Sequence, residues 1–257
     1  MSSTAVIVLA VIVFTLSCAD EIIFHPPRAS YTDDADVIKL TTADGKMISA
    51  MYFEKEDAEF TILFSHGNAE DIGHNREFFR LLNRWGFSVF AYDYHGYGTS
   101  QGRPSEKNAY LDIDAAWRYL VDDLATEPNR IIALGRSVGS GPAVYLATRT
   151  KPAGLVLESP LTSVFRVVTR IGILPFDKFD NIAKIAHVHC PVLIIGGEAD
   201  NVVGIRHGKA LYEKANEPKQ HLWVPGAGHN DLLWVAGDRY RQALDEFVRL
   251  IRRQTNN

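Results

Sequence analysis

The chain has 257 residues, of which 46% are apolar and 23% charged, and its formal net charge is −4 at pH 7. This length and composition are typical of one globular domain with a sizeable core. The mildly acidic balance and the lack of a basic stretch give no sign of a nucleic-acid-binding surface. The two cysteines are too few for a disulfide-stabilised scaffold.

The N-terminal segment differs in composition from the rest of the chain. Residues 5–16, AVIVLAVIVFTL, form an unbroken apolar run that is followed by SCAD. The run is shorter than the about 20 residues of a membrane-spanning helix and fits the core of a signal peptide. Ser17 and Ala19 give the small-x-small pattern of signal peptidase sites, and Cys18 gives an imperfect lipoprotein signal. We expect residues 1–19 to be a signal peptide or membrane anchor, so that the protein is exported or membrane-anchored, with a buried N-terminal strand or helix as the alternative.

Extended and helical patterns alternate from residue 36 onward. Asp44-Gly45 separates two extended runs in residues 36–53, which predicts a β-hairpin. Further short apolar runs lie in residues 60–65, 86–92, 130–134, 154–158, 191–197 and 221–224. Helical spacing of apolar residues separates several of them, and Ser105 is placed to cap the helix that follows it. Strands that alternate with helices predict an α/β fold with a mostly parallel sheet and an antiparallel N-terminal hairpin.

One stretch interrupts this alternation. Residues 160–189 separate two predicted strands by more than a simple crossover requires, and they are rich in apolar and aromatic side chains. An insertion at the carboxyl end of a parallel sheet is placed to form a lid or a substrate wall. We therefore predict a short lid insertion at 160–189, with a longer ordinary crossover as the alternative.

The segment Gly135-Arg136-Ser137-Val138-Gly139 contains a G-x-S-x-G motif. The motif alone is a weak signal, but here it follows a predicted strand and opens a predicted helix, as a nucleophile elbow does. In such an elbow the backbone of the serine is strained, and side chains two residues away on either side would clash with neighbouring elements. The two glycines therefore indicate a bend that presents Ser137.

A serine nucleophile needs a base and an orienting acid, and in this architecture they follow in the order serine, acid, histidine. Asp200 ends one later strand, and His229 follows the last one within a turn of small residues. Glu158 and Glu198 are the alternative acids. Asp200 is favoured because it lies one strand before His229 and further out in its loop.

The developing oxyanion needs hydrogen-bond donors near the serine. The N–H of Val138, directly after the nucleophile, is one candidate, and the N–H of Asn68 or Ala69 in the loop after an earlier strand is the other. Asp231, after His229, is placed to cap the last helix. The histidines of the HVH segment lack a convincing third ligand, and the chain has no phosphate-binding loop, so we expect neither a metal nor a cofactor.

With these residues assembled, the chain resembles the α/β-hydrolase-domain proteins that remove palmitate from cysteines of membrane-associated proteins, and their bacterial relatives. The similar segments are LFSHGNAEDIG, YDYHGYGTSQGRPSEKNAYLDIDAAW, SPLTS, PVLIIGGEAD, HGKALYEKA and LWVPGAGHND. The resemblance implies an α/β-hydrolase domain, placed here at 30–255, with Ser137 as nucleophile, His229 as base and Asp200 as acid.

These features together predict a serine hydrolase that cleaves acyl esters or thioesters through an acyl-enzyme. The resemblance makes palmitoylated proteins the expected substrates, and a general carboxylesterase or lipase is the alternative. A non-catalytic α/β-hydrolase scaffold that only binds its partners is an alternative of a different class. The intact set of Ser137, Asp200 and His229 argues against that scaffold.

Overall fold

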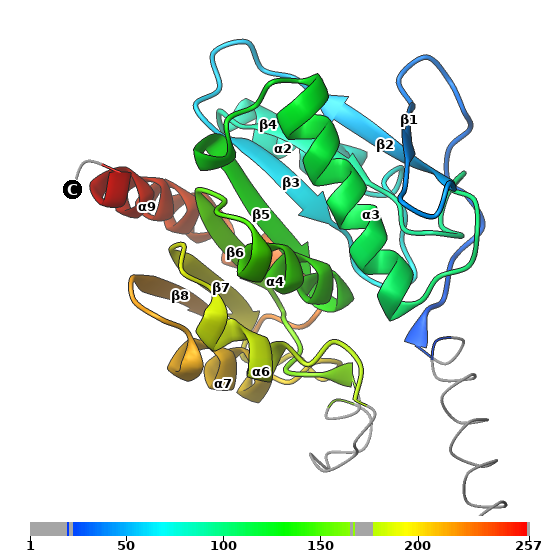
Figure 1. Ribbon diagram of the computed structural model, residues 1–257. Helices are drawn as coiled ribbons and strands as arrows, with labels where there is room; N and C mark the ends of the chain where they lie inside the picture. Colours follow the sequence, from blue (N-terminus) through cyan, green and yellow to red (C-terminus); the bar gives the residue numbers. More distant parts are fainter. Residues whose placement is uncertain (1–19, 21–22, 165–166, 168–176, 256–257) are drawn as a thin grey trace, which may run out of the picture.

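The fold is built on a single eight-stranded sheet, seen in a computed structural model that describes residues 20, 23–164, 167 and 177–255. The strands are arranged in the order β1-β2-β4-β3-β5-β6-β7-β8 (Figure 1). This order is that of a doubly wound sheet with a hairpin added at one edge, and the predicted α/β-hydrolase architecture is confirmed. The strands are β1 (Ile38–Thr41), β2 (Met47–Phe53), β3 (Thr61–Ser65), β4 (Ser88–Tyr92), β5 (Ile131–Arg136), β6 (Gly154–Glu158), β7 (Val192–Gly197) and β8 (Lys219–Val224).

The predicted hairpin forms the antiparallel edge of the sheet. β1 pairs antiparallel with β2, and β2 pairs antiparallel with β4. Gly45 has a φ of +80° in the turn, a conformation that glycine adopts without steric cost. The remaining pairs, from β4 through β3 to β8, are parallel.

Helices cover both faces of the sheet (Figure 1). α3 and α4 pack on one face over β4 and β5, and α7 covers β7 on that same side. α2 and α9 lie on the opposite face, against β4 and β8 respectively. The α-helices are α2 (Arg76–Arg84), α3 (Glu106–Arg118), α4 (Ser140–Arg149), α6 (Asn181–Lys184), α7 (Arg206–Lys214), α8 (Leu232–Ala236) and α9 (Asp238–Thr255).

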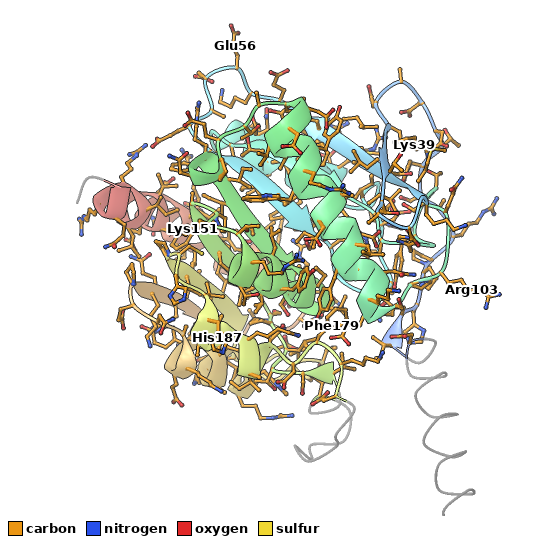
Figure 2. The ribbon with its side chains drawn as sticks, in the orientation of Figure 1. Lys39, Glu56, Arg103, Lys151, Phe179 and His187 are labelled. Atoms are coloured by element: carbon orange, nitrogen blue, oxygen red, sulfur yellow. The ribbon has the colours of Figure 1, made fainter. Side chains whose placement is uncertain are left out.

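The core therefore consists of two apolar layers, one on each side of the sheet. β3, β4 and β6 are buried along their whole length, as expected of parallel strands that are covered on both faces. Figure 2 shows charged side chains such as Glu56 and Arg103 extending outward from the ribbon. The described residues also contain four short helical turns: the π-helical η1 (Tyr119–Asp123) and the 3₁₀-helical η2 (Pro128–Arg130), η3 (Ser137–Gly139) and η4 (Ile185–His187).

Two local expectations can be compared with the structure. Ser105 caps α3 as predicted, because its hydroxyl accepts the N–H of Asn108 at 3.0 Å. The expectation for Asp231 is wrong, since this residue precedes α8 instead of the last helix. Its carboxylate accepts the N–H of Gly228 at 2.6 Å, which closes the turn around His229 instead of capping α9.

The predicted lid lies partly outside the described residues, which lack 165–166 and 168–176. Within its described part, Phe179 packs into the core: it is fully buried and contacts the rings of Phe24 and Tyr110. The predicted signal or anchor segment, 1–19, also lies outside the described residues. Among the helices of the described part, none has the length and apolarity needed to cross a bilayer.

Candidate active site

The turn between β5 and α4 presents Ser137. Ser137 has a φ of 53°, in the left-handed region. A Cβ on Gly135 would lie 2.4 Å from the carbonyl oxygen of Gly139, and a Cβ on Gly139 would lie 2.2 Å from that of Ser65. Both glycines are therefore required by close backbone approach. Ser140 closes the turn by donating its hydroxyl to the Ser137 carbonyl at 2.6 Å.

Three side chains from three strand ends form a continuous hydrogen-bonded row. His229 Nε2 lies 3.0 Å from Ser137 Oγ, and His229 Nδ1 lies 2.7 Å from Asp200 Oδ2. Ser137 follows β5, Asp200 follows β7 and His229 follows β8. Since β5 to β8 are parallel, their carboxyl ends meet at one edge of the sheet. The structure thus brings together the three residues that the chain order predicts.

The electrostatics of Asp200 define the proton positions in this row. Burial opposes ionisation of Asp200, but the hydrogen bond from His229 and the N–H groups of Val203 and Val202, at 2.8 and 2.9 Å, outweigh it. The pKa of Asp200 is consequently held below its ordinary value. An ionised carboxylate only accepts hydrogen bonds, so Nδ1 of His229 carries the proton. The Nε2 lone pair then faces the Ser137 hydroxyl.

The two alternative acids are placed differently. Glu198 is exposed at the end of β7. Glu158 is buried, and its two oxygens are occupied: Arg136 Nε donates to one at 2.7 Å, and the Tyr240 hydroxyl donates to the other at 2.5 Å. Asp200 is therefore the carboxylate that reaches His229 among the three candidates.

Arg136, between the glycine and the serine of the motif, packs its guanidinium against two aromatic rings next to the elbow. Its guanidinium carbon lies 4.6 Å from the ring centroid of Phe78 and 5.3 Å from that of Phe64. Arg136 also donates to Asn75 Oδ1 at 2.8 Å, besides its ion pair with Glu158. Sequence reasoning missed this role of Arg136. A charged residue at the last position of an otherwise buried strand is the signal that could have indicated it.

The loop after β3 lies beside the nucleophile, where the second oxyanion donor is expected. A Cβ on Gly67 would lie 3.7 Å from the Cβ of Ser137. The N–H of Gly67 donates to Glu70 Oε1 at 2.6 Å, and the N–H of Ala69 donates to Asn68 Oδ1 at 3.0 Å. Among the described residues, the N–H of Asn68 has no hydrogen-bond acceptor. Of the two predicted donors in this loop, Asn68 is therefore the one whose N–H is available.

Val138 is the other predicted donor. It lies in the first turn of the helical segment formed by η3 and α4. The first N–H groups of a helix have no partner within the helix and point toward its N-terminal end. The Val138 N–H is thus placed beside Ser137 to bind a negatively charged oxygen.

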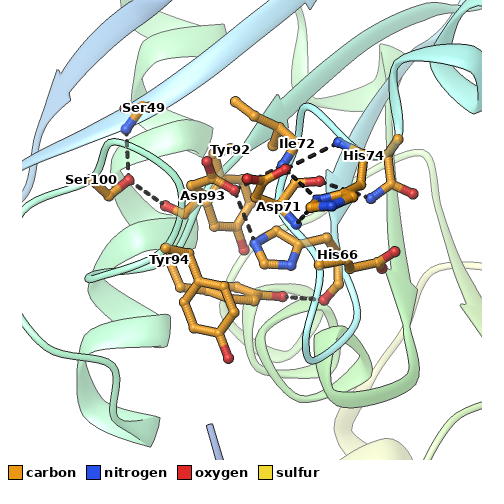
Figure 3. Close-up of polar contacts among 12 residues, drawn as sticks. Ser49, His66, Asp71, Ile72, His74, Tyr92, Asp93, Tyr94 and Ser100 are labelled. Atoms are coloured by element: carbon orange, nitrogen blue, oxygen red, sulfur yellow. Dashed lines mark hydrogen bonds and ion pairs between the residues drawn. The ribbon is translucent and has the colours of Figure 1, made fainter. Parts of the chain in front are cut away.

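His66 lies beneath this loop and is fully buried (Figure 3). Its Nδ1 donates to the Gly67 carbonyl at 2.7 Å, and its Nε2 lies 3.3 Å from Asp93 Oδ1. Burial alone would lower the pKa of His66, but Asp93 outweighs burial and raises that pKa above its ordinary value. The ring also packs on Tyr94, whose hydroxyl donates to the His66 carbonyl at 2.7 Å. His66 therefore stabilises the loop from the protein interior. Its two ring nitrogens face the Gly67 carbonyl and Asp93, so His66 is not placed to act as the base for Ser137.

A pocket of about 670 Å³ opens over Ser137 and His229. Its apolar lining comes from Phe78 of α2, Val202 after β7, and Leu232 and Leu233 of α8. The described residues of the predicted insertion do not line it. The pocket is large enough to hold an extended acyl group next to Ser137 and His229. No group of histidine, cysteine and acidic side chains within the described part of the chain is suited to hold a metal ion.

Comparisons with known proteins show which family this chain resembles. Residues 56–184 match the family model described as serine aminopeptidase, S33. The chain is 43% identical over 220 residues to the α/β hydrolase domain-containing protein 17B of Xenopus tropicalis, covering 84% of this chain and 76% of that protein. The human protein 17B is 42% identical over the same length. Among solved structures, an esterase of Pyrococcus furiosus superposes with a TM-score of 0.75 over 88% of this chain and 99% of that one, at 21% identity.

Proposed function

This chain belongs to the α/β-hydrolase family as a serine hydrolase that acts on acyl esters, and we propose that Ser137, His229 and Asp200 are its catalytic triad. The observation that carries the proposal is the hydrogen-bonded row from Ser137 Oγ through His229 to Asp200, of which Ser137 and His229 line the pocket. A serine hydroxyl becomes a nucleophile when a neighbouring base takes its proton. The row supplies that base and the acid that orients it.

The reaction that this geometry supports has two halves. His229 Nε2 takes the proton of Ser137 Oγ as the oxygen attacks the acyl carbonyl carbon, and the carbonyl oxygen becomes an oxyanion. The oxyanion is bound by the N–H groups of Val138 and Asn68. When the tetrahedral intermediate collapses, the bond to the leaving alcohol or thiol breaks and His229 gives it the proton. Water, activated by His229, then hydrolyses the acyl-enzyme and releases the carboxylic acid.

Long-chain acyl thioesters on proteins are the substrates that we propose. The apolar lining from Phe78, Val202, Leu232 and Leu233 supports an acyl chain in the pocket. The resemblance to the α/β-hydrolase-domain depalmitoylases supports cysteine-linked palmitate as the acyl group. We also propose that residues 1–19 attach the protein to a membrane or direct its export, on the strength of the apolar run at 5–16.

The first experiment tests the nucleophile with a fluorophosphonate probe, which reacts with activated serines. Ser137→Ala should abolish both labelling and ester hydrolysis, because no other hydroxyl is bonded to His229 Nε2 among the described residues. Thr148→Ala is the control, since it removes a hydroxyl of α4 that bonds the Tyr145 carbonyl and does not line the pocket, and it should retain labelling. Labelling that persists in Ser137→Ala would overturn the assignment.

A second experiment tests the substrate class. Hydrolysis of matched oxygen esters and thioesters with acyl chains from acetyl to palmitoyl should show kcat/KM rising with chain length and higher for thioesters. A maximum at short oxygen esters would instead favour a general carboxylesterase. Mass spectrometry of the mature N-terminus distinguishes cleavage, lipidation at Cys18 and retention of the first 19 residues.

A further inference from the structure

The segment just after the N-terminal apolar region lies directly on the loop that carries the Asn68 N–H. The Asn68 side chain bonds this segment on both sides of Phe24. Its Nδ2 donates to the Ile23 carbonyl at 2.5 Å, and its Oδ1 accepts the N–H of His25 at 2.9 Å. The amide of Asn68 thereby makes the two hydrogen bonds that a neighbouring strand would make to this backbone.

Phe24 fixes the segment through its ring. It is 3% exposed, and its ring meets those of Tyr97 and Phe179 edge to face, with centroid distances of 6.4 and 6.0 Å. The Tyr97 hydroxyl also donates to Asn68 Oδ1 at 2.7 Å. The contacts of Phe24 and of Asn68 therefore form one connected unit.

Asp20 provides a second attachment point. Its carboxylate lies 3.3 Å from Lys178 Nζ and accepts the N–H of Glu106 at 3.3 Å. Glu106 is the first residue of α3, where a negative charge is stabilised by the unpaired N–H groups of the helix. Asp20 and residues 23–25 are thus bonded to the loop after β3, to the start of α3 and to Lys178 of the 160–189 insertion.

We infer that Asp20 and residues 23–25 are a positioning element for the oxyanion donor of this hydrolase, acting through the Asn68 side chain. The inference rests on the proposed function. Asn68 Oδ1 binds the N–H of Ala69 as well as the N–H of His25, so that one amide group holds both the segment and the turn of the loop. Because these bonds fix the Asn68 side chain, they also fix the direction in which the backbone N–H of Asn68 points. The segment that joins the predicted anchor to the catalytic domain is therefore part of the apparatus that stabilises the transition state.

Asn68→Ala and Phe24→Ala in the full-length chain test this inference. Asn68→Ala keeps the backbone N–H but removes the bonds to the segment, and Phe24→Ala keeps Asn68 but removes the ring that anchors the segment. Loss of one oxyanion donor costs about 10²–10³ in kcat, and we expect a misdirected donor to cost about 10- to 100-fold. KM for a short ester should change little, since the apolar residues that line the pocket are untouched. Rates are normalised to the fraction of active sites that a fluorophosphonate probe labels.

Two further readouts separate positioning from general loss of structure. Binding of a trifluoromethyl ketone, whose adduct with the serine carries an oxyanion, should weaken by the same factor as kcat/KM falls. The midpoint of the pH profile of kcat/KM should stay in place, because the contact between His229 and Asp200 is unchanged. The double variant should lose little more than Asn68→Ala alone, since both substitutions break one unit.

Asn83→Ala is the matched control, because the Asn83 amide also bonds to backbone but lies far from the site. It donates to the carbonyls of Phe53, Glu54 and Phe87. The substitution should lower the unfolding temperature without lowering kcat per active site. The inference is overturned if Asn68→Ala and Phe24→Ala keep kcat within twofold, or if Asn83→Ala loses as much. Activity that persists in Ser137→Ala would instead refute the proposed function, so the two failures are distinguishable.

Discussion

Ser137 combines a left-handed backbone with a side chain, a conformation that costs about 1–2 kcal/mol for residues other than glycine. The Ser140 hydroxyl bond and the tight contacts at Gly135 and Gly139 hold it there. The strain directs Oγ away from the sheet and toward His229. At the scale of single residues, the site thus depends on small side chains in the places where the backbone has no spare room.

The choice of acid is also decided residue by residue. Asp200→Asn should lower kcat by about 10³- to 10⁴-fold, because an amide in place of the carboxylate no longer holds His229 with its proton on Nδ1. Steady-state hydrolysis of a short ester measures this loss. The unfolding temperature should fall too, since Asp200 also accepts the N–H groups of Val202 and Val203, but the variant should be fully folded at the assay temperature.

Glu158→Gln is the matched comparison for that variant. It leaves His229 alone but breaks the buried ion pair with Arg136. We expect kcat to stay within about tenfold and the free energy of unfolding to fall by about 3 kcal/mol. If Glu158→Gln loses more turnover than Asp200→Asn, the assignment of the acid is wrong.

At the scale of elements, the junction of β5 with α4 is the tightest part of the site. The carbonyl of Ser65, at the end of β3, lies where a side chain on Gly139 would begin. The elbow can therefore be this sharp only because the neighbouring strand and helix pack backbone against backbone. The strand–turn–helix pattern was readable from the sequence because it is local. The contact with β3 was not, because it joins residues far apart in the chain.

Gly139→Ala should destabilise the fold by about 3 kcal/mol, since the added methyl group must displace backbone atoms. Chemical denaturation measures the change. Gly45→Ala serves as the comparison, because a Cβ there meets no atom within 4 Å and adds only the cost of a φ of +80°, about 1–2 kcal/mol. Equal losses in the two variants would contradict the steric explanation.

At the scale of the whole molecule, buried polar groups join distant segments around the site. Asp71 accepts the backbone N–H of Ser30 at 2.7 Å, which fixes the N-terminal stretch to the loop before α2. It also accepts the backbone N–H of His74 at 3.0 Å (Figure 3). Burial opposes ionisation of Asp71, but the bond from the Ser30 hydroxyl and these two N–H bonds outweigh it and hold the pKa of Asp71 below its ordinary value. The ionised carboxylate of Asp71 therefore contributes to the cohesion of the domain.

This contribution predicts a pH dependence of stability. A carboxyl group whose pKa is lowered by folding stabilises the native state above its unfolded pKa of about 3.9, and that stability is lost as the pH falls through the folded value. Asp71→Asn should therefore lower the free energy of unfolding at pH 7 by about 1–2 kcal/mol, through weakened hydrogen bonds, and by less at pH 3. Urea denaturation at pH 7, 5, 4 and 3 measures the difference. If the difference in unfolding free energy between the parent and Asp71→Asn is the same at all four pH values, the prediction is wrong.

The sequence alone was enough for the fold and for the order of the reactive residues. Hydrophobic periodicity and glycine placement are local properties, and parallel strands oblige their carboxyl ends to share one edge. Ser137, Asp200 and His229 could therefore be expected near one another before any distance was known. The same reasoning left three acids open and two donors open in the loop after β3.

Only the tertiary structure decided between those alternatives, because each depends on contacts between distant parts of the chain. Glu158 is occupied by Arg136 and Tyr240, the latter 82 positions away, while Asp200 faces His229. The Ala69 N–H is taken by the Asn68 side chain, which itself bonds a segment more than 40 residues earlier. Hydrogen bonds of this kind leave no periodic trace in a sequence, since any polar residue of suitable reach can form them once packing has brought it close.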